Sequence, residues 1–143
     1  MEEVFNKIEI LGNENQVKEV RNFLRGEPNA PNMYIDFNRI IPSPDGEESI
    51  EWNCENWGTK YNAYYQESPQ SNIIEFATVD IPVPGLMTEL SAEFPDVPFL
   101  YHFDLPDVIM DPEVSLFIKN GVGIEIPQSC FETNYMNEIN IKN

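Results

Sequence analysis

The chain has 143 residues, 41% of them hydrophobic, with nine Phe, six Tyr and two Trp, so it can build one domain around a sizeable core. Its formal net charge of -17 at pH 7 repels phosphates and argues against direct binding to DNA or RNA. The two cysteines, Cys54 and Cys130, are too few for a disulfide framework and fit a reducing compartment. No apolar stretch approaches the roughly 20 residues that span a bilayer, and the N-terminus does not resemble a signal peptide, which predicts a cytoplasmic protein with no membrane partner.

The negative charge is unevenly distributed along the chain. Residues 40–141 contain eighteen acidic residues but only two basic ones, Lys60 and Lys119. Such a surface favours another protein with a basic surface as the partner, because opposite charge steers association. The simpler alternative is that the acidity only keeps the chain in solution. The sequence does not indicate an oligomeric state.

The first 26 residues predict a strand followed by a helix. Apolar and polar residues alternate over residues 4–11, the period-2 pattern of a half-buried strand. Asn13 then offers a helix N-cap, and Gln16 stands three residues later, where a capping-box partner belongs. One face of the expected helix is apolar and consists of Val17, Val20 and Leu24.

The middle of the chain predicts extended segments joined by turns. Residues 33–41 are expected to be extended, and residues 45–48 form a polar loop. Residues 54–63 are interpreted as a structural turn that leads into a strand, since Gly58 allows a left-handed backbone. Two further strands, 61–66 and 73–79, are expected to form a hairpin around the loop 68–72.

The last part of the chain predicts a helix, a strand and a second hairpin. Met87, Leu90 and Phe94 follow helical spacing within residues 84–94. Residues 98–104 favour a strand. Asn120-Gly121 lies between two apolar runs in residues 115–126, and this dipeptide suits the type I′ turn of a hairpin.

The order of these elements predicts an α+β fold. Strand, helix, hairpin, helix and strand in succession match a ferredoxin-like βαββαβ sandwich, an antiparallel sheet with two helices on one face. A C-terminal β-hairpin is added to it. We therefore expect a single domain over residues 1–143, with a core over about residues 4–104 and a hairpin extension over about residues 113–128. The fold name implies no iron–sulfur cluster, because two distant cysteines cannot hold one.

Three stretches of the sequence carry a family resemblance. They are Ile-Asp-Phe-Asn-Arg-Ile-Ile-Pro at residues 35–42, Glu-Asn-Trp-Gly-Thr-Lys-Tyr-Asn-Ala-Tyr at 55–64, and Leu-Ser-Ala-Glu-Phe-Pro-Asp at 90–96. Over about residues 7–103 the chain resembles the YubB-type ferredoxin-like family of bacterial plasmids, phages and other mobile elements. Tyr61 departs from the family pattern, which has Trp there, and residues 104–114 diverge. The resemblance implies a fold and a mobile-element context, and it transfers no catalytic residue.

The motif Asn-Trp-Gly-Thr-Lys at residues 56–60 allows two interpretations. In the structural one, Trp57 packs at the sheet edge while Asn56 and Thr59 bond to loop backbone. In the functional one, Trp57 and Lys60 are exposed and contact a partner. The sequence leaves both open.

Residues that could support catalysis or metal binding are few. Cys54 and His102, the sole histidine, are about fifty residues apart and neither has the local signature of a nucleophile–base pair. Strand alternation places His102 on the outer face, with Leu100 and Asp104. Zinc requires more His and Cys ligands, and the acidic stretches 45–48 and 104–113 do not match a calcium loop. We therefore predict no catalytic residue, cofactor or metal.

These observations favour a non-catalytic protein-interaction module that acts through its acidic surface, and the resemblance implies that a phage or mobile element encodes it. One alternative is an inhibitor that mimics nucleic acid and blocks a host defence or DNA-processing protein, with glutamate carboxylates in place of phosphates. A second alternative is a small carboxylate-dependent hydrolase that uses the open sheet face. The residues predicted to bind the partner are Glu47, Glu48, Glu51, Glu55, Trp57 and Lys60.

Overall fold

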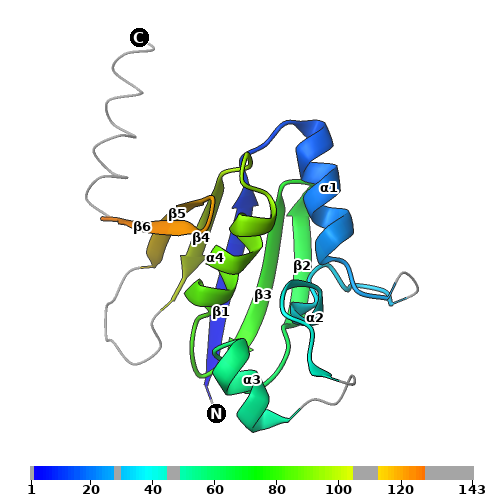
Figure 1. Ribbon diagram of the computed structural model, residues 1–143, viewed down its shortest axis with the longest axis vertical. Helices are drawn as coiled ribbons and strands as arrows, with labels where there is room; N and C mark the ends of the chain where they lie inside the picture. The colour runs from blue at the N-terminus through cyan, green and yellow to red at the C-terminus, as the bar shows by residue number, and fades with distance from the viewer. Residues whose placement is uncertain (1, 28–29, 45–48, 105–112, 128–143) are drawn as a thin grey trace.

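The computed structural model describes residues 2–27, 30–44, 49–104 and 113–127, which form an α+β fold (Figure 1). Six strands form one antiparallel sheet in the order β2-β3-β1-β4-β5-β6, and four helices accompany it. The elements in chain order are β1 (Glu3–Ile10), α1 (Glu14–Leu24), α2 (Phe37–Ile40), α3 (Ile50–Asn56), β2 (Tyr64–Gln70), β3 (Ile73–Val79), α4 (Pro84–Glu93), β4 (Phe99–Phe103), β5 (Val114–Lys119) and β6 (Val122–Ile126).

The first strand and helix form as their sequence patterns predict. In β1 the residues Val4, Ile8 and Ile10 are buried, as the period-2 pattern requires. The capping box of α1 is present, because Asn13 Oδ1 accepts from the Gln16 amide and Gln16 Oε1 accepts from the Asn13 amide, both at 2.9 Å. The predicted apolar face of α1 is the one that is buried.

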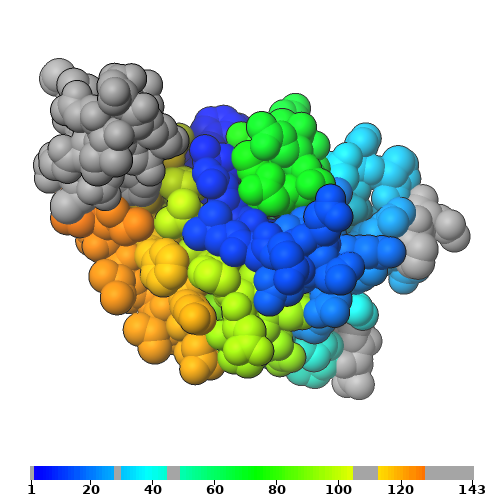
Figure 2. Space-filling model, turned by 90° about the horizontal axis from the view of Figure 1, so that it is seen from above, coloured from blue at the N-terminus to red at the C-terminus, as the bar shows by residue number. Residues whose placement is uncertain are grey.

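Both predicted hairpins are confirmed. β2 and β3 pair antiparallel, although β2 begins at Tyr64 and includes residues 68–70, which the sequence predicted as loop. In the β5–β6 turn, Asn120 has φ +49° and Gly121 has φ +78°, the positive values that a type I′ turn needs. This hairpin continues the sheet beyond β4 and lies beside α4, as Figure 2 also shows.

Two short helices, α2 and α3, replace structure that the sequence predicted differently. The extended prediction for residues 33–41 was wrong at α2, where Asp36 caps the helix by accepting from the Asn38 amide at 3.0 Å. The turn predicted over residues 54–63 was wrong at its start, because α3 runs to Asn56 from its cap at Ser49. Neither helix is long enough to show apolar periodicity.

The extended part of that segment, residues 33–36, is held by a side chain rather than by strand pairing. Gln66 of β2 accepts from the Tyr34 and Ile35 amides at 2.6 and 2.9 Å and donates to the Ile35 carbonyl at 2.9 Å. The amide group of Gln66 therefore satisfies backbone groups that a neighbouring strand would otherwise satisfy.

The helices pack against one face of the sheet and leave the other without a helical cover in the described parts of the chain (Figure 1). The core of the described residues combines apolar residues of β1, β3 and β4 with those of α1 and α4. The opposite face, which we call the open face, carries the alternate residues of the same strands, such as Phe5, Lys7 and Glu9.

Candidate functional site

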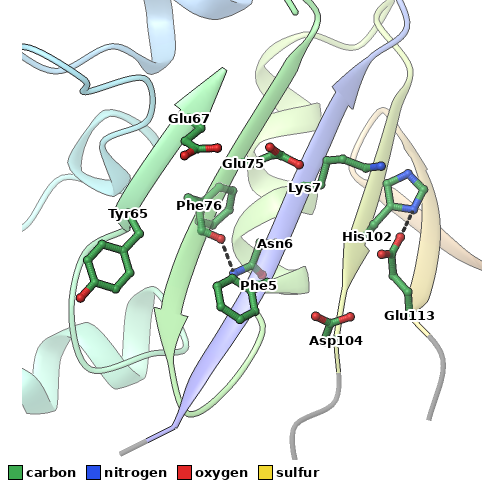
Figure 3. A pocket seen from close by; sticks show the side chains of 10 residues that line it. All are labelled: Phe5, Asn6, Lys7, Tyr65, Glu67, Glu75, Phe76, His102, Asp104 and Glu113. Atoms are coloured by element: carbon green, nitrogen blue, oxygen red, sulfur yellow. Dashed lines mark hydrogen bonds and ion pairs between the residues drawn. The ribbon is translucent and has the colours of Figure 1, made fainter. Parts of the chain in front are cut away.

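A pocket of about 410 Å³ lies on the open face, across β1, β2, β3 and β4. Its volume is in the range typical of ligand sites. Its described lining includes four carboxylates and two exposed aromatic residues. We call it the acidic pocket after these six residues: Phe5, Tyr65, Glu67, Glu75, Asp104 and Glu113 (Figure 3).

The two aromatic side chains of the acidic pocket are unusually accessible. Tyr65 is 71% exposed and Phe5 is 58% exposed. Tyr65 also has φ +49°, at a place where the pairing of β2 with β3 shifts register. A left-handed backbone costs a residue other than glycine about 1–2 kcal/mol. An irregularity of this kind turns a large ring toward solvent instead of into the core.

Two glutamates of the pocket face each other across neighbouring strands. Glu67 of β2 and Glu75 of β3 are direct cross-strand partners. Like charges in such a position repel each other and destabilise the sheet. Lys7 of β1 faces Glu75 on the other side of β3, but its ion pair is with Glu9, whose Oε1 lies 3.7 Å from Nζ, and Figure 3 shows the side chain extending toward His102.

His102 borders the pocket, and its ring is buried between acidic groups. The ring is on the outer face, as alternation predicted, but it is only 7% exposed. Its Nδ1 lies 2.6 Å from Ser115 Oγ and 3.2 Å from Glu113 Oε1, and its Nε2 lies 3.4 Å from Glu9 Oε1. Two opposing effects act on the pKa of His102. Burial of the ring is the larger effect and lowers the pKa, whereas the carboxylate of Glu113 raises it. The imidazole is therefore neutral at pH 7.

This lowered pKa makes stability depend on pH with a defined sign. The unfolded chain binds a proton at His102 near pH 6.5, but the folded chain resists protonation until the pH is lower. We expect the contribution of His102 to stability to be complete above pH 6.5 and to be lost as the pH falls through the folded pKa. Chemical denaturation of wild type and His102→Gln between pH 7 and about pH 5 measures it, with wild type losing more stability than the variant.

The single histidine also allows a direct check. Its ring proton resonances titrate without overlap from another histidine, and we expect a midpoint below 6.5. Groups facing the ring, namely Lys7, Glu9 and Glu113, contribute their own charges, so the comparison with His102→Gln is made at each pH. Stability curves of wild type and variant that run parallel would contradict the assignment.

The residues predicted to bind a partner lie in different environments. Glu51 and Glu55 are exposed one turn apart on α3, and Lys60 pairs with Asp80 at 3.3 Å, also at the surface. Glu47 and Glu48 lie outside the described residues. Among the described members of the set, none lines the acidic pocket.

Trp57, by contrast, is 1% exposed and belongs to the core. Its Nε1 donates to the Ile41 carbonyl at 2.8 Å, and its ring meets Phe37 and Trp52 edge-on. Thr59 is buried as well and donates to the Val79 carbonyl at 2.8 Å. A ring so enclosed has no surface to offer a partner, which favours the structural interpretation of the motif.

Cys54 and His102, which the sequence analysis considered as a nucleophile–base pair, lie on different elements. Cys54 is exposed on α3 and is not part of the pocket that His102 borders. Over the residues described, no group of three or more His, Cys, Asp or Glu is placed to hold a metal ion. The four pocket carboxylates therefore line a common space without converging on one point. None of the described helices is both long and apolar enough to cross a membrane.

Comparison with family models, with curated proteins and with solved structures finds no match to this chain.

Sequence reasoning did not identify the acidic pocket. Phe5, Glu67 and Glu75 are separated by up to seventy residues and become neighbours only through the pairing of β1, β2 and β3. The available signal was weak: Phe5 and Lys7 alternate with buried residues, which places them on the outer face of their strand.

Proposed function

We propose that the protein is a non-catalytic module that binds another protein through its acidic surface. The observation that carries this proposal is the open face, where Phe5 and Tyr65 are exposed among carboxylates. Aromatic residues at the centre of a protein surface are typical of interaction sites, and a surrounding charge selects a partner of opposite sign. The expected partner is a protein with a basic surface.

The proposal includes a ferredoxin-like topology for the fold and a mobile-element origin for the chain. The segment from β1 to β4 is a ferredoxin-like unit, supported by the strand order β2-β3-β1-β4 with α1 and α4 as its crossover helices. Kinship with the YubB-type family, with a mobile-element context and action in the cytoplasm, follows from the resemblance of residues 35–42, 55–64 and 90–96.

Charge-dependent capture tests this function. The tagged full-length chain, incubated with host extract at about 0.15 M salt, is expected to retain a specific protein and to release it at about 1 M salt, where the Debye length shrinks to roughly 3 Å. The retained protein is identified, purified and returned to the assay alone. Failure of any purified protein to bind the chain directly would contradict the proposal.

The nucleic-acid mimic is the narrower version of this function. Glu51 and Glu55 support it, because they are exposed one turn apart on α3 and present two carboxylates on one side. In this version the retained protein is a nucleic-acid-binding protein, and DNA or RNA competes with the chain for it. A retained protein indifferent to nucleic acid excludes the mimic but leaves the binding module in place.

A carboxylate-dependent hydrolase is the alternative from another class, and the acid-lined pocket is the observation that favours it. The arrangement of His102 argues against it. Nδ1 of the ring is occupied by Ser115 and Glu113, and Nε2 faces Glu9, so neither nitrogen is presented to a substrate as a general base.

A further inference from the structure

The acidic pocket has features that cost stability. The described cation that faces the repelling pair is Lys7, opposite Glu75 across β1 and β3, and its ion pair is with Glu9. The Glu67–Glu75 pair repels across two strands, and Tyr65 adopts a left-handed backbone to turn its ring outward. Unfavourable local features such as charge repulsion and backbone strain are expected at functional sites, where binding of a partner can offset their cost. The net charge of the pocket indicates the kind of partner group that would bind there.

Among the described residues, the pocket lining includes four carboxylates, on Glu67, Glu75, Asp104 and Glu113, and one ammonium, on Lys7. His102 adds no positive charge near neutral pH, because burial of its ring lowers its pKa. A cation entering from solvent is therefore attracted by an excess of negative charge. It also relieves the cross-strand repulsion, which no ion pair between Lys7 and the two facing glutamates does in this structure.

We infer that the acidic pocket binds an arginine side chain of the partner protein, held between the exposed rings and the Glu67–Glu75 pair. This inference rests on the proposed function. The guanidinium is planar, so one of its faces can stack on Tyr65 or Phe5 while its edge donates to carboxylates. Figure 3 shows the two rings at one end of the pocket, with the glutamate pair beyond them.

Arginine suits this arrangement better than lysine. Lysine presents a compact, strongly hydrated charge with no planar face to stack on a ring. Arginine donates in a fork that matches one carboxylate or bridges two, and such bonds are about twice as strong as those between neutral groups. The exposed rings would gain little from lysine beyond contact with its aliphatic stem.

The test uses the full-length chain, labelled with ¹⁵N, and the capped peptide acetyl-Gly-Arg-Gly-amide as probe. We expect saturable chemical-shift changes at millimolar peptide, confined to amides of residues 5–7, 65–67, 75–76 and 102–104. The lysine peptide should bind more weakly, and the citrulline peptide, which keeps the shape without the charge, should not bind. Shifts spread over every acidic surface, or none at all, would overturn the inference.

Matched variants separate a built site from general attraction. Glu67→Gln with Glu75→Gln should weaken arginine-peptide binding about tenfold, and Tyr65→Ala about two- to fivefold. Glu89→Gln with Glu93→Gln removes the same charge from two exposed positions one turn apart on α4 and should leave binding unchanged. Equal weakening by both double variants would show that only net charge matters and would overturn the inference. The pocket double variant should melt no lower than wild type, because it removes a repulsion.

The same variants distinguish this inference from the proposed function. If the purified partner binds the Glu67→Gln, Glu75→Gln variant as tightly as wild type, the arginine site is wrong but the module still binds a protein. If the arginine peptide binds in the pocket but no protein binds the chain, the proposed function is wrong and the pocket remains a guanidinium site.

Discussion

Replacing Trp57 by alanine is expected to lower the free energy of unfolding by about 3–5 kcal/mol, the range for a fully buried large aromatic residue. The ring is 1% exposed and packs edge-on against Phe37 and Trp52. Its loss leaves a cavity and removes the donor to the Ile41 carbonyl. Because α3 has only seven residues, its position depends on this anchor more than on helix propensity. Chemical denaturation followed by far-UV circular dichroism gives the value.

Tyr65→Ala is the matched control for this substitution. It also removes an aromatic ring, but one that is 71% exposed, so its effect on stability should stay within about 0.5 kcal/mol. Trp57→Phe should fall between the two, since it keeps a ring and loses the hydrogen bond. If Trp57→Ala lowers the free energy of unfolding by less than about 1 kcal/mol, the ring is not a core element. The functional interpretation of residues 56–60, in which they contact a partner, would then be favoured.

The elements that the sequence predicted correctly have signals contained within a few neighbouring residues. Asn13 and Gln16 define the start of α1 by themselves, and Asn120-Gly121 requires positive φ wherever it sits between strands. α2 and α3 lack such self-contained signals. Each is shorter than the length at which an isolated helix is stable, and packing of Phe37 and Trp57 into the core determines where they form.

The candidate site illustrates the same limit at longer range. Alternation predicted the face on which His102 lies, but its burial depends on Ser115 and Glu113, which β5 brings alongside β4. The pairing of Glu67 with Glu75 depends on a register that shifts on both sides of Glu67, and no local pattern encodes that register. Charge composition could therefore predict an acidic surface, but not where its carboxylates meet exposed rings.

Tyr101→Phe is expected to destabilise the protein by about 2–6 kcal/mol, although it removes only one oxygen atom. The buried hydroxyl donates to Asn6 Oδ1 at 2.5 Å and accepts from the Val83 amide at 2.9 Å. Burial raises the pKa of Tyr101 well above its ordinary range, so the hydroxyl keeps its proton and remains a donor. Phenylalanine leaves two buried polar groups without partners, and each costs about 1–3 kcal/mol.

A double-mutant cycle with Asn6→Leu tests whether these groups act as a unit. Asn6 also donates to the Phe76 carbonyl and to Thr78 Oγ1, which ties β1 to β3 inside the core. Once Asn6 is replaced, the hydroxyl of Tyr101 has lost its acceptor, so removing it should cost clearly less than in wild type. Tyr65→Phe, which removes an exposed hydroxyl, should change stability by no more than about 0.5 kcal/mol. Additive losses in the cycle, or a Tyr101→Phe effect as small as that of Tyr65→Phe, would show that the hydrogen bonds of Asn6, Tyr101 and Val83 do not act as a unit.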